Sequence, residues 1–316
     1  MSSPTTHVVE PPAKPRPSAV TERDIARAGA TRRRRDSRVK IWVGTIAVLI
    51  VIAPVALARV LPLPSPDATN LAGRRLPPLT DGHLFGTDQL GRDLLARVLY
   101  GGQVSLVIGV LAVLVSGLIG LVLGALAGYR GGWIDTVVSR LLEAQLSLPL
   151  LMMLLLVVAL FGPSIPVITF VIAIAQWPEI ARLTRSLTLV EREKPYIAAA
   201  HVLGLGQTGI LVRHIVPNIV KQVSLVVLLL LAQAVLLESA LSYLGAGPQR
   251  PFATWGRIIS DGQDYVTTSW WLVTLPGLVI AVLVVGVNLL GDGLRDRAGG
   301  PKTGLLKLFS LRRKGK

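Results

Sequence analysis

The residues with the clearest chemical pattern are three glycines in the stretch AAAHVLGLGQTG. Gly204, Gly206 and Gly209 fit the spacing G-x-G-x-x-G, which in dinucleotide-binding proteins lets the backbone approach a pyrophosphate. That use also needs a preceding strand and an acidic residue about 20 positions further on, which holds the ribose. After Glu193, however, the next Asp or Glu is Glu238, inside a long apolar run. We therefore interpret the glycine spacing as coincidental.

The remaining residue types argue against a catalytic or metal centre. The sequence contains no cysteine, which excludes disulfides, thiolate metal sites and cysteine nucleophiles. Its four histidines are His7, His83, His201 and His214, and none lies in a long apolar run or in an H-E-x-x-H motif. The sequence also lacks the phosphate-binding loop G-x-x-x-x-G-K-[ST]. We expect a protein that is not an enzyme and binds no metal or cofactor of its own.

The composition is typical of a membrane protein. Of the 316 residues, 51% are apolar and only 16% are charged, and the mean hydropathy is +0.59. Water-soluble domains of this length rarely show such a balance. Apolar runs long enough for spanning helices lie at about 41–58, 104–128, 137–161, 164–180, 222–244 and 270–291. The sequence therefore predicts an all-α fold, that of a polytopic membrane protein with six transmembrane helices.

One membrane domain with two polar tails accounts for the whole chain. Residues 1–36 contain five prolines and the basic run Arg32–Arg35, with too little apolar surface to offset the entropy cost of ordering. We expect this segment to be a disordered tail. Residues 37–297 form the predicted membrane domain, and residues 298–316 form a basic C-terminal tail.

The distribution of lysine and arginine predicts the orientation. With a cytoplasmic N-terminus, 26 of the 33 Lys and Arg residues fall on cytoplasmic segments, as the positive-inside rule requires. Six spans then place both termini in the cytoplasm. The net charge of +15 is mainly a topology signal, with attraction to anionic lipid as a secondary effect. We expect no nucleic-acid partner, because the Arg32–Arg35 run lies just before the first span.

The longest internal cytoplasmic segment, residues 182–221, contains a short predicted helix. Pro195 suits its first turn, and Ala198-Ala199-Ala200 gives it high helix propensity with little side-chain bulk. Gly204 lies where a helix end requires a left-handed residue. We expect one face of this helix to be formed by Ile197, Ala200 and Leu203. Such a helix could enter a groove of another protein, or the segment could simply return the chain to the membrane.

This segment resembles the EAA loop of membrane subunits of ATP-binding-cassette (ABC) importers. The loop pattern is Glu-Ala-Ala, three residues, Gly, nine residues, Ile, any residue, Leu, Pro. The residues that match its spacing are Ala199, Ala200, Gly204 and Pro217, whereas Ala198, His214 and Val216 replace the acidic residue, the isoleucine and the leucine. The run from Arg213 to Asn218, RHIVPN, resembles the version in the dipeptide and oligopeptide permease subfamily.

Three further stretches resemble the same subfamily, in the same order along the chain. They are GTDQLGRD at 86–93, ESALSYLGAG at 238–247 followed by Trp255-Gly256, and NLLGDGLRD at 288–296. The resemblance covers residues 41 to 297 and is closest to the C-type permease subunit, which pairs with a related B-type subunit.

The resemblance implies a function and partners. It implies the type I ABC importer permease fold, in a bacterial plasma (inner) membrane. The chain would be half of a heterodimeric pore for dipeptides or oligopeptides, and the pore would work by alternating access. Its partners would be two ATPase subunits that use ATP and Mg, and an extracytoplasmic substrate-binding protein. The residues implied to couple to the ATPases are Ala198, Ala199, Ala200, Leu203, Gly204, Arg213, His214 and Pro217. Two competing hypotheses are an importer of another solute, such as nickel or an oligosaccharide, and a membrane scaffold or enzyme without an ATPase partner.

The stretch GTDQLGRD is a second candidate site. Its signature residues are Gly86, Thr87, Asp88, Gly91, Arg92 and Asp93. The residue types alone predict a helix cap at Thr87-Asp88, with Asp and Arg pairing at the surface. The helix that follows is expected to lie on the membrane surface and to stop at Gly101-Gly102. The resemblance places the stretch on the outer face, where a receptor protein docks or a gate closes.

Two features inside the spans remain. Gly120, Gly124 and Gly128 recur at every fourth position, which lets a neighbouring helix approach closely. Glu238 is an acidic residue within an apolar run, where it either faces the conduit or a partner helix, or has a structural role near the outer interface. The residues alone slightly favour the structural role.

Overall fold

The computed structural model describes residues 19–249 and 252–297, with side chains from Asp36 onward. The predicted tail 298–316 and the first part of the predicted N-terminal tail lie outside the described residues. The described chain contains helices and no strand. They are α1 (Ala19–Leu57), η1 (Leu71–Gly73), α2 (Leu94–Arg130), α3 (Gly132–Leu146), α4 (Leu150–Phe161), α5 (Ile165–Arg192), α6 (Pro195–Val202), α7 (Gln207–Ile210), η2 (Leu211–Ile215), α8 (Val216–Tyr243), α9 (Trp255–Gly262), η3 (Gln263–Tyr265) and α10 (Trp271–Arg297).

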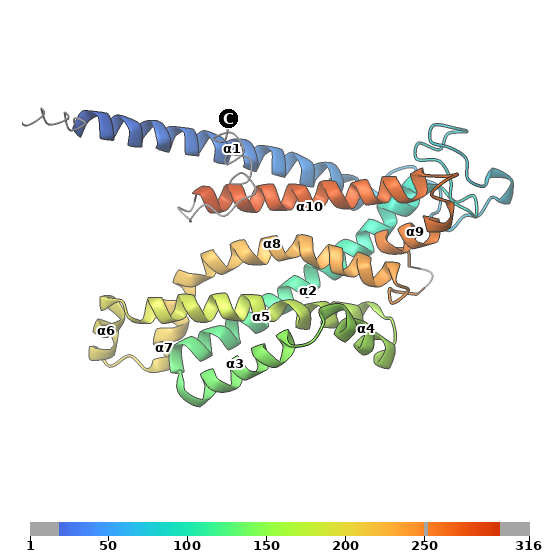
Figure 1. Cartoon of the computed structure of the whole chain (residues 1–316). Coiled ribbons are helices and arrows are strands. Elements are labelled where there is room, and N and C mark those ends of the chain that lie inside the picture. Colours follow the sequence, from blue (N-terminus) through green and yellow to red (C-terminus); the bar gives the residue numbers. More distant parts are fainter. Residues whose placement is uncertain (1–18, 250–251, 298–316) are drawn as a thin grey trace, which may run out of the picture.

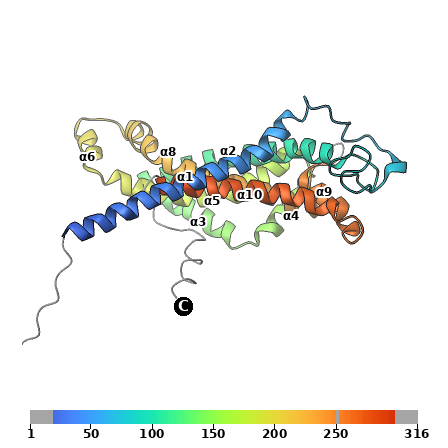
Figure 2. The ribbon, with the colours of Figure 1, turned by 90° about the horizontal axis from the view of Figure 1, so that it is seen from above.

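The long helices form an elongated bundle (Figure 1). Five helical segments are long and apolar enough to cross a membrane, and the bent pair α3 and α4 supplies a sixth span. Short helix α6 lies at one end of the bundle, and α9 lies at the other with the long loop that precedes α2 (Figures 1 and 2). We call these the α6 end and the α9 end. The six predicted spans are thus confirmed, one of them as a broken helix.

Helix α1 begins earlier than expected. It starts at Ala19, so residues 19–36, which we expected to be disordered, continue the first spanning helix. The physical reason is local. No proline follows Pro17 until Pro54, and the alanine- and arginine-rich sequence between them has high helix propensity. Because the apolar span already supplies a helical nucleus, extending it costs little.

The helix expected to lie on the membrane surface is instead the start of a span. Helix α2 runs without interruption from Leu94, which is fully buried, through Gly101-Gly102. A Cβ atom at Gly102 would lie 2.7 Å from Cζ2 of Trp255, so these glycines allow α2 to pack closely against α9. The predicted helix stop is wrong because glycine both ends helices and permits close contacts.

The packing role predicted for Gly120, Gly124 and Gly128 is confirmed. All three are buried where α2 crosses α5. A Cβ atom at Gly120 would lie 2.6 Å from Cβ of Ile180, and one at Gly128 would lie 2.7 Å from the carbonyl oxygen of Arg185. The repeat of four residues therefore forms a groove that receives α5.

Replacing Gly124 with alanine is expected to destabilise the protein. The added methyl group would lie 2.8 Å from Cβ of Thr184 and even closer to the carbonyl oxygen of Ala181, which belongs to the helix backbone. Overpacking of this kind costs about 1–3 kcal/mol. The matched control is Gly117→Ala in the same helix, where the nearest atom, on Val227, is 3.5 Å away. Thermal unfolding in detergent should show a lower midpoint for Gly124→Ala alone; equal midpoints would contradict this packing.

The third apolar run is broken rather than straight. Helices α3 and α4 meet at an angle of 92°, and Pro149 lies at the break. Proline lacks an amide N–H and disfavours helical geometry in the residue before it, so the helix ends just upstream. A bidentate ion pair holds α3 against α5, with Nη2 of Arg185 2.7 Å from Oδ2 of Asp135.

The first and last spans are joined at the α6 end. Nζ of Lys40 on α1 lies 2.7 Å from Oδ2 of Asp296 on α10. A Cβ atom at Gly44 would lie 2.6 Å from the backbone nitrogen of Leu290, so the two helices touch along their backbones. Their antiparallel arrangement places the start of the first span and the end of the last at the same end of the bundle (Figure 1).

Candidate functional site

The predicted site residues fall into two groups at opposite ends of the bundle. The predicted coupling residues lie on α6, on the turn after it, and on η2 and the start of α8. The GTDQLGRD signature lies before α2 at the α9 end (Figures 1 and 2). Whatever links the two groups must therefore run through the spanning helices.

Helix α6 has the predicted beginning and end. Pro195 is in its first turn, and Gly204 has φ of +79°, the left-handed conformation expected after a helix. The backbone N–H of Leu205 donates to the carbonyl of Ala200 at 3.2 Å, and that of Gly204 donates to His201 at 3.0 Å. These bonds satisfy carbonyls that a helix end would leave free.

One face of α6 is buried, and the other face is exposed and apolar. Ile197 and Ala200 pack in a cluster with residues of α2, α7 and η2. Leu203 was expected on this face, but it is 78% exposed because the chain leaves the helix there. Val202 is 88% exposed, and Ala198 and Ala199 are exposed beside it. Large apolar side chains exposed outside the spans are typical of a site where another protein docks.

A polar network, which the sequence did not predict, anchors α6 to the neighbouring helices. The hydroxyl of Tyr196 donates to Oε1 of Glu191 at 2.6 Å, and Nζ of Lys194 donates to Oε2 of the same carboxylate at 2.7 Å. Nδ2 of Asn218 donates to the Tyr196 hydroxyl at 2.9 Å. Burial, followed by the hydrogen bond to Glu191 and its charge, raises the pKa of Tyr196 above its ordinary value of 10.0. The end of α5, the start of α6 and the start of α8 are thus tied together.

Replacing Tyr196 with phenylalanine should loosen α6. The change removes the hydrogen bond to the Glu191 carboxylate and the one from the Asn218 amide. At this part-exposed position we expect the local stability of α6 to fall by about 1 kcal/mol. Hydrogen exchange of the α6 amides should then become about fivefold faster. Tyr243→Phe is the control, because its hydroxyl makes no hydrogen bond to the described part of the chain. Unchanged α6 exchange in Tyr196→Phe would show that the network is not an anchor.

The other predicted coupling residues surround a π-helical turn. In η2 the backbone N–H of Val216 donates to the carbonyl of Leu211, which is one residue further back than in an α-helix. Pro217 follows directly; it cannot donate, and its ring would clash with the carbonyl of Arg213 in a regular helix. Arg213 and Pro217 are exposed and His214 is half-buried. Contact between these residues and an ATPase stays a prediction.

The GTDQLGRD stretch folds around a buried carboxylate rather than pairing at the surface. Asp88 is 1% exposed. Its Oδ1 accepts from the backbone N–H groups of Leu90 at 2.8 Å and Arg92 at 3.0 Å. Its Oδ2 accepts from Nε of Arg92 and from Nη1 of Arg97, both at 2.7 Å. The predicted surface pairing is therefore wrong.

The cap of α2 is also different from the one predicted at Thr87-Asp88. Asp93 caps the helix, with its Oδ1 accepting from the backbone N–H of Ala96 at 2.7 Å. Its other oxygen contacts Nδ1 of His83 at 2.7 Å. Thr87 instead fastens the preceding loop, since its hydroxyl accepts from the backbone N–H of Leu76 at 2.8 Å.

Two glycines of the signature have backbone conformations that favour glycine. Gly86 and Gly91 have φ of +75° and +74°. A Cβ atom at Gly91 would also collide with the backbone of Asn70. Both positions therefore need glycine so that the turn can wrap around Asp88.

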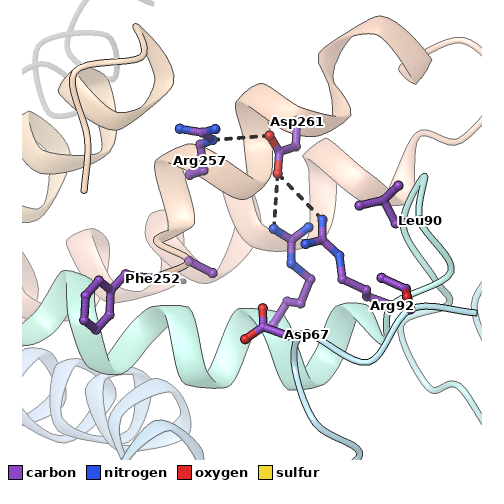
Figure 3. Close-up of a pocket in the computed structure, with 9 residues that line it drawn as sticks. Asp67, Leu90, Arg92, Phe252, Arg257 and Asp261 are labelled. Carbon is purple, nitrogen blue, oxygen red and sulfur yellow. Dashed lines mark hydrogen bonds and ion pairs between the residues drawn. The ribbon is translucent and has the colours of Figure 1, made fainter. Parts of the chain in front are cut away.

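Asp261, which is distant in the sequence, completes a group that we call the Asp88–Asp261 ion cluster. Its members are Asp88, Arg92, Arg97, Arg257 and Asp261. Oδ2 of Asp261, on α9, lies 3.1 Å from Nη2 of Arg97 and 3.9 Å from Nη2 of Arg92 (Figure 3). Oδ1 of Asp261 lies 3.4 Å from Nε of Arg257. Sequence reasoning missed Asp261, and the only local signal was the four-residue spacing from Arg257.

Glu238 lies inside the subunit. It is fully buried in α8, and the hydroxyl of Ser242 donates to its Oε1 at 2.6 Å. Nearby, Ser105 of α2 accepts from the backbone N–H of Trp255 at 3.2 Å, which marks the junction of α2, α8 and α9. In this conformation Glu238 does not face a conduit or a partner. The geometry fits the structural role.

Within the part of the chain that the structure describes, no three His, Asp or Glu side chains gather in a way that could hold a metal ion. The ion clusters at both ends pair acids with bases, so their arrangement suits the fastening of helices to one another.

Comparison with known proteins finds matches along most of the chain. Residues 120–298 match the family model described as the inner membrane component of binding-protein-dependent transport systems. The oligopeptide transport system permease protein OppC of Escherichia coli K12 is 45% identical over 266 residues, 84% of this chain and 88% of that protein. A putative peptide transport system permease protein of Brucella suis is 37% identical over 283 residues, 89% and 95% of the two chains.

A third relative, the probable D,D-dipeptide transport system permease protein DdpC of Escherichia coli K12, is 37% identical over 242 residues, 75% of this chain and 81% of that protein. Residues 120–298, which match the family model, contain α3 to α10, with the α6 segment among them, and the part of α2 that crosses α5. The chain therefore belongs to the ABC-importer permeases, as a multi-pass inner membrane component of a binding-protein-dependent transport system.

Proposed function

We propose that this chain is the peptide-conducting membrane subunit of an ATP-driven importer. It forms half of a pore with a second, B-type permease subunit. Two ATPase subunits bind at the α6 end, where they use ATP and Mg, and a substrate-binding protein docks at the α9 end. This chain binds no cofactor. The observation that carries the proposal is the exposed apolar face of α6, a helix that hydrogen bonds connect to α5 and α8.

The charge distribution supports the orientation in this proposal. The α6 end carries the exposed Arg213 and the Lys40–Asp296 pair, and the sequence places most Lys and Arg residues on the segments at that end. The positive-inside rule then puts the α6 end, with both termini, in the cytoplasm. The α9 end faces the outside.

The anchoring of α6 supports a mechanism of coupling. A push on α6 is passed to α5 through the Tyr196–Glu191 hydrogen bond and to α8 through Asn218. Reversing a two-state gate from 1:99 to 99:1 takes about 5.5 kcal/mol of differential binding. Two nucleotides bound by the partner ATPases supply this energy, and the spans alternate in the side to which they open.

The names of the relatives support the substrate class. All three are described as permeases of oligopeptide, peptide or D,D-dipeptide transport systems. The proposed cargo is therefore dipeptides or oligopeptides.

Deleting the chain should stop the accumulation of radiolabelled peptide, whereas loss of nickel or oligosaccharide uptake instead would identify a different cargo.

Site-specific photocrosslinking in intact membranes tests the coupling. A crosslinker at Ala199, on the exposed side of α6, should capture an ATPase subunit. A crosslinker at Leu79, which is also exposed but lies at the α9 end, should not. If Ala199 captures no nucleotide-hydrolysing protein, the proposed coupling is wrong.

A further inference from the structure

Exposed polar side chains lie on one side of the α5–α8 helix pair. Glu179 of α5 and Gln233 of α8 are both exposed. Each lies two residues before a residue that packs against α2, namely Ala181 and Val235. Two residues turn a helix by about 200°, so both side chains lie on the side away from α2. Figure 1 shows α2 crossing behind α5 and α8. We call the free side, marked by Glu179 and Gln233, the α5–α8 face.

The α5–α8 face differs from a surface that suits lipid. By contrast, the exposed residues of α2 between Val107 and Val122 are all valine or leucine. Glu179 lies at the midpoint of the 28-residue α5, and Gln233 lies in the apolar run VSLVVLLLLAQAVLL of α8. Neither side chain makes a hydrogen bond or an ion pair to the described part of the chain. Because hydrocarbon offers such groups no partner, this face must meet water or another polar molecule.

The separation of the two polar residues suits a short peptide. Nε2 of Gln176 on α5 donates to the carbonyl oxygen of Leu230 on α8 at 3.0 Å, so these two residues lie at a similar depth. The helices are antiparallel. Glu179 therefore lies three residues from this bond toward the α6 end, and Gln233 lies three residues from it toward the α9 end. At 1.5 Å per residue, Glu179 and Gln233 are roughly 9 Å apart along the bundle, the length of about three extended residues.

Glu179 and Gln233 match groups that unmodified peptides share. A carboxylate accepts hydrogen bonds from an ammonium terminus, and a glutamine amide both donates and accepts, as the peptide group does. Neither contact depends on the side chains of the cargo. Arg182, exposed one turn closer to the α6 end, makes no ion pair with Glu179. A single exposed carboxylate binds a cation weakly, which suits a cargo that must be released.

We propose that the α5–α8 face binds the peptide inside the conduit, where Glu179 contacts its ammonium terminus and Gln233 hydrogen-bonds to its main chain. This inference rests on the proposed function and deepens it, because it names the residues that contact the cargo. A polar helix of the partner permease is the competing occupant of this face. Water reaches the face if it lines a conduit, whereas a partner helix would exclude water.

The absence of cysteine from this sequence allows a direct test of water access. Gln233→Cys and Leu114→Cys would be placed in separate full importer complexes in nanodiscs and treated with a charged, water-soluble methanethiosulfonate. Labelling of this chain would be measured by mass spectrometry. Leu114 is the control because it is 59% exposed within α2. Since the thiolate is the reactive form, Gln233→Cys should react at least about tenfold faster. Equally slow reaction would show that lipid or a partner helix covers the face, and would overturn the proposal.

Protection of the same thiol tests the ligand class without the substrate-binding protein. A tripeptide with a free amino terminus should slow labelling of Gln233→Cys at about fivefold lower concentration than its N-acetyl form. This difference should vanish when Glu179→Gln is added. It should persist with Glu143→Gln, the control, whose exposed carboxylate pairs with Arg140. Equal protection by the two peptides would overturn the ammonium contact, and no protection by either would overturn peptide binding at this face.

The main-chain hydrogen bond has its own test. Gln233→Leu keeps most of the side-chain bulk but removes the amide, and it should lower peptide uptake about fivefold. Gln233→Asn keeps the amide and should lose less. Wild-type uptake by Gln233→Leu would overturn the role of Gln233.

Failures of this site and of the proposed function are distinguishable. If the wild-type complex imports peptide while Gln233→Cys stays unreactive, the site is wrong and the importer function stands. If the complex imports no peptide, and another solute protects Gln233→Cys, the proposed cargo is wrong, and the assignment of Glu179 to an ammonium terminus is overturned with it.

Discussion

Replacing Gly204 with valine is expected to reduce ATP-driven peptide uptake about fivefold to thirtyfold while membrane insertion continues. Gly204 has φ of +79°, and a Cβ atom added there would have no neighbouring atom within 4 Å. The strain is therefore purely conformational. A β-branched residue in the left-handed region costs about 1–2 kcal/mol or more. The end of α6 should rearrange, and the exposed Val202 and Leu203 would move away from the position in which we propose that they dock.

Gly206→Val is the matched control for this prediction. Gly206 also has open space around it, but its φ is −65°, which valine adopts without strain. Both variants would be reconstituted with their partner subunits, and peptide uptake and ATP hydrolysis would be measured side by side. Gly204→Val should hydrolyse ATP with little uptake, whereas Gly206→Val should behave as the wild type. Normal uptake by Gly204→Val would show that the shape of the α6 end is unimportant for coupling.

Local signals predicted the parts of this fold that depend on neighbours in sequence. Hydropathy located the spans, and the four-residue glycine repeat located the α2–α5 crossing. Pro195 and Gly204 located the two ends of α6. In each case the physical cause lies in the sequence of a single element. That cause is the length of an apolar run, the spacing of small residues or a backbone preference.

The errors came from contacts between residues far apart in the sequence. Gly101-Gly102 was interpreted as a helix stop because its partner, Trp255, lies more than 150 positions away. Arg92 was expected to pair at the surface because the GTDQLGRD stretch alone gives no sign that Asp261 of α9 will lie beside it. The buried, unpaired Nη2 of Arg92 and Nε of Arg97 are a further case, since burial without an acceptor exists only in the assembled bundle.

Replacing Asp88 with asparagine is expected to be the most destabilising of the substitutions considered. The carboxylate accepts four hydrogen bonds, two from backbone N–H groups and two from Arg92 and Arg97. An amide has only one acceptor oxygen, and its NH₂ group would face a guanidinium. Two buried cations would then depend on Asp261 alone. Breaking a buried pair in this way costs about 3–5 kcal/mol, a large share of the roughly 5–15 kcal/mol that holds a folded protein together.

Asp81→Asn is the matched control, because it makes the same chemical change on the same loop. Asp81 is exposed, and its φ of +49° is one that asparagine tolerates. Size-exclusion chromatography after stepwise heating in detergent should show early loss of the Asp88→Asn monodisperse peak and a wild-type profile for Asp81→Asn. Because Asp88 ties the loop before α2 to α2, and through Arg97 to α9, the loss should be global rather than confined to the loop. Equal profiles for the two variants would mean that a group other than the Asp88 carboxylate compensates the charges of the buried arginines.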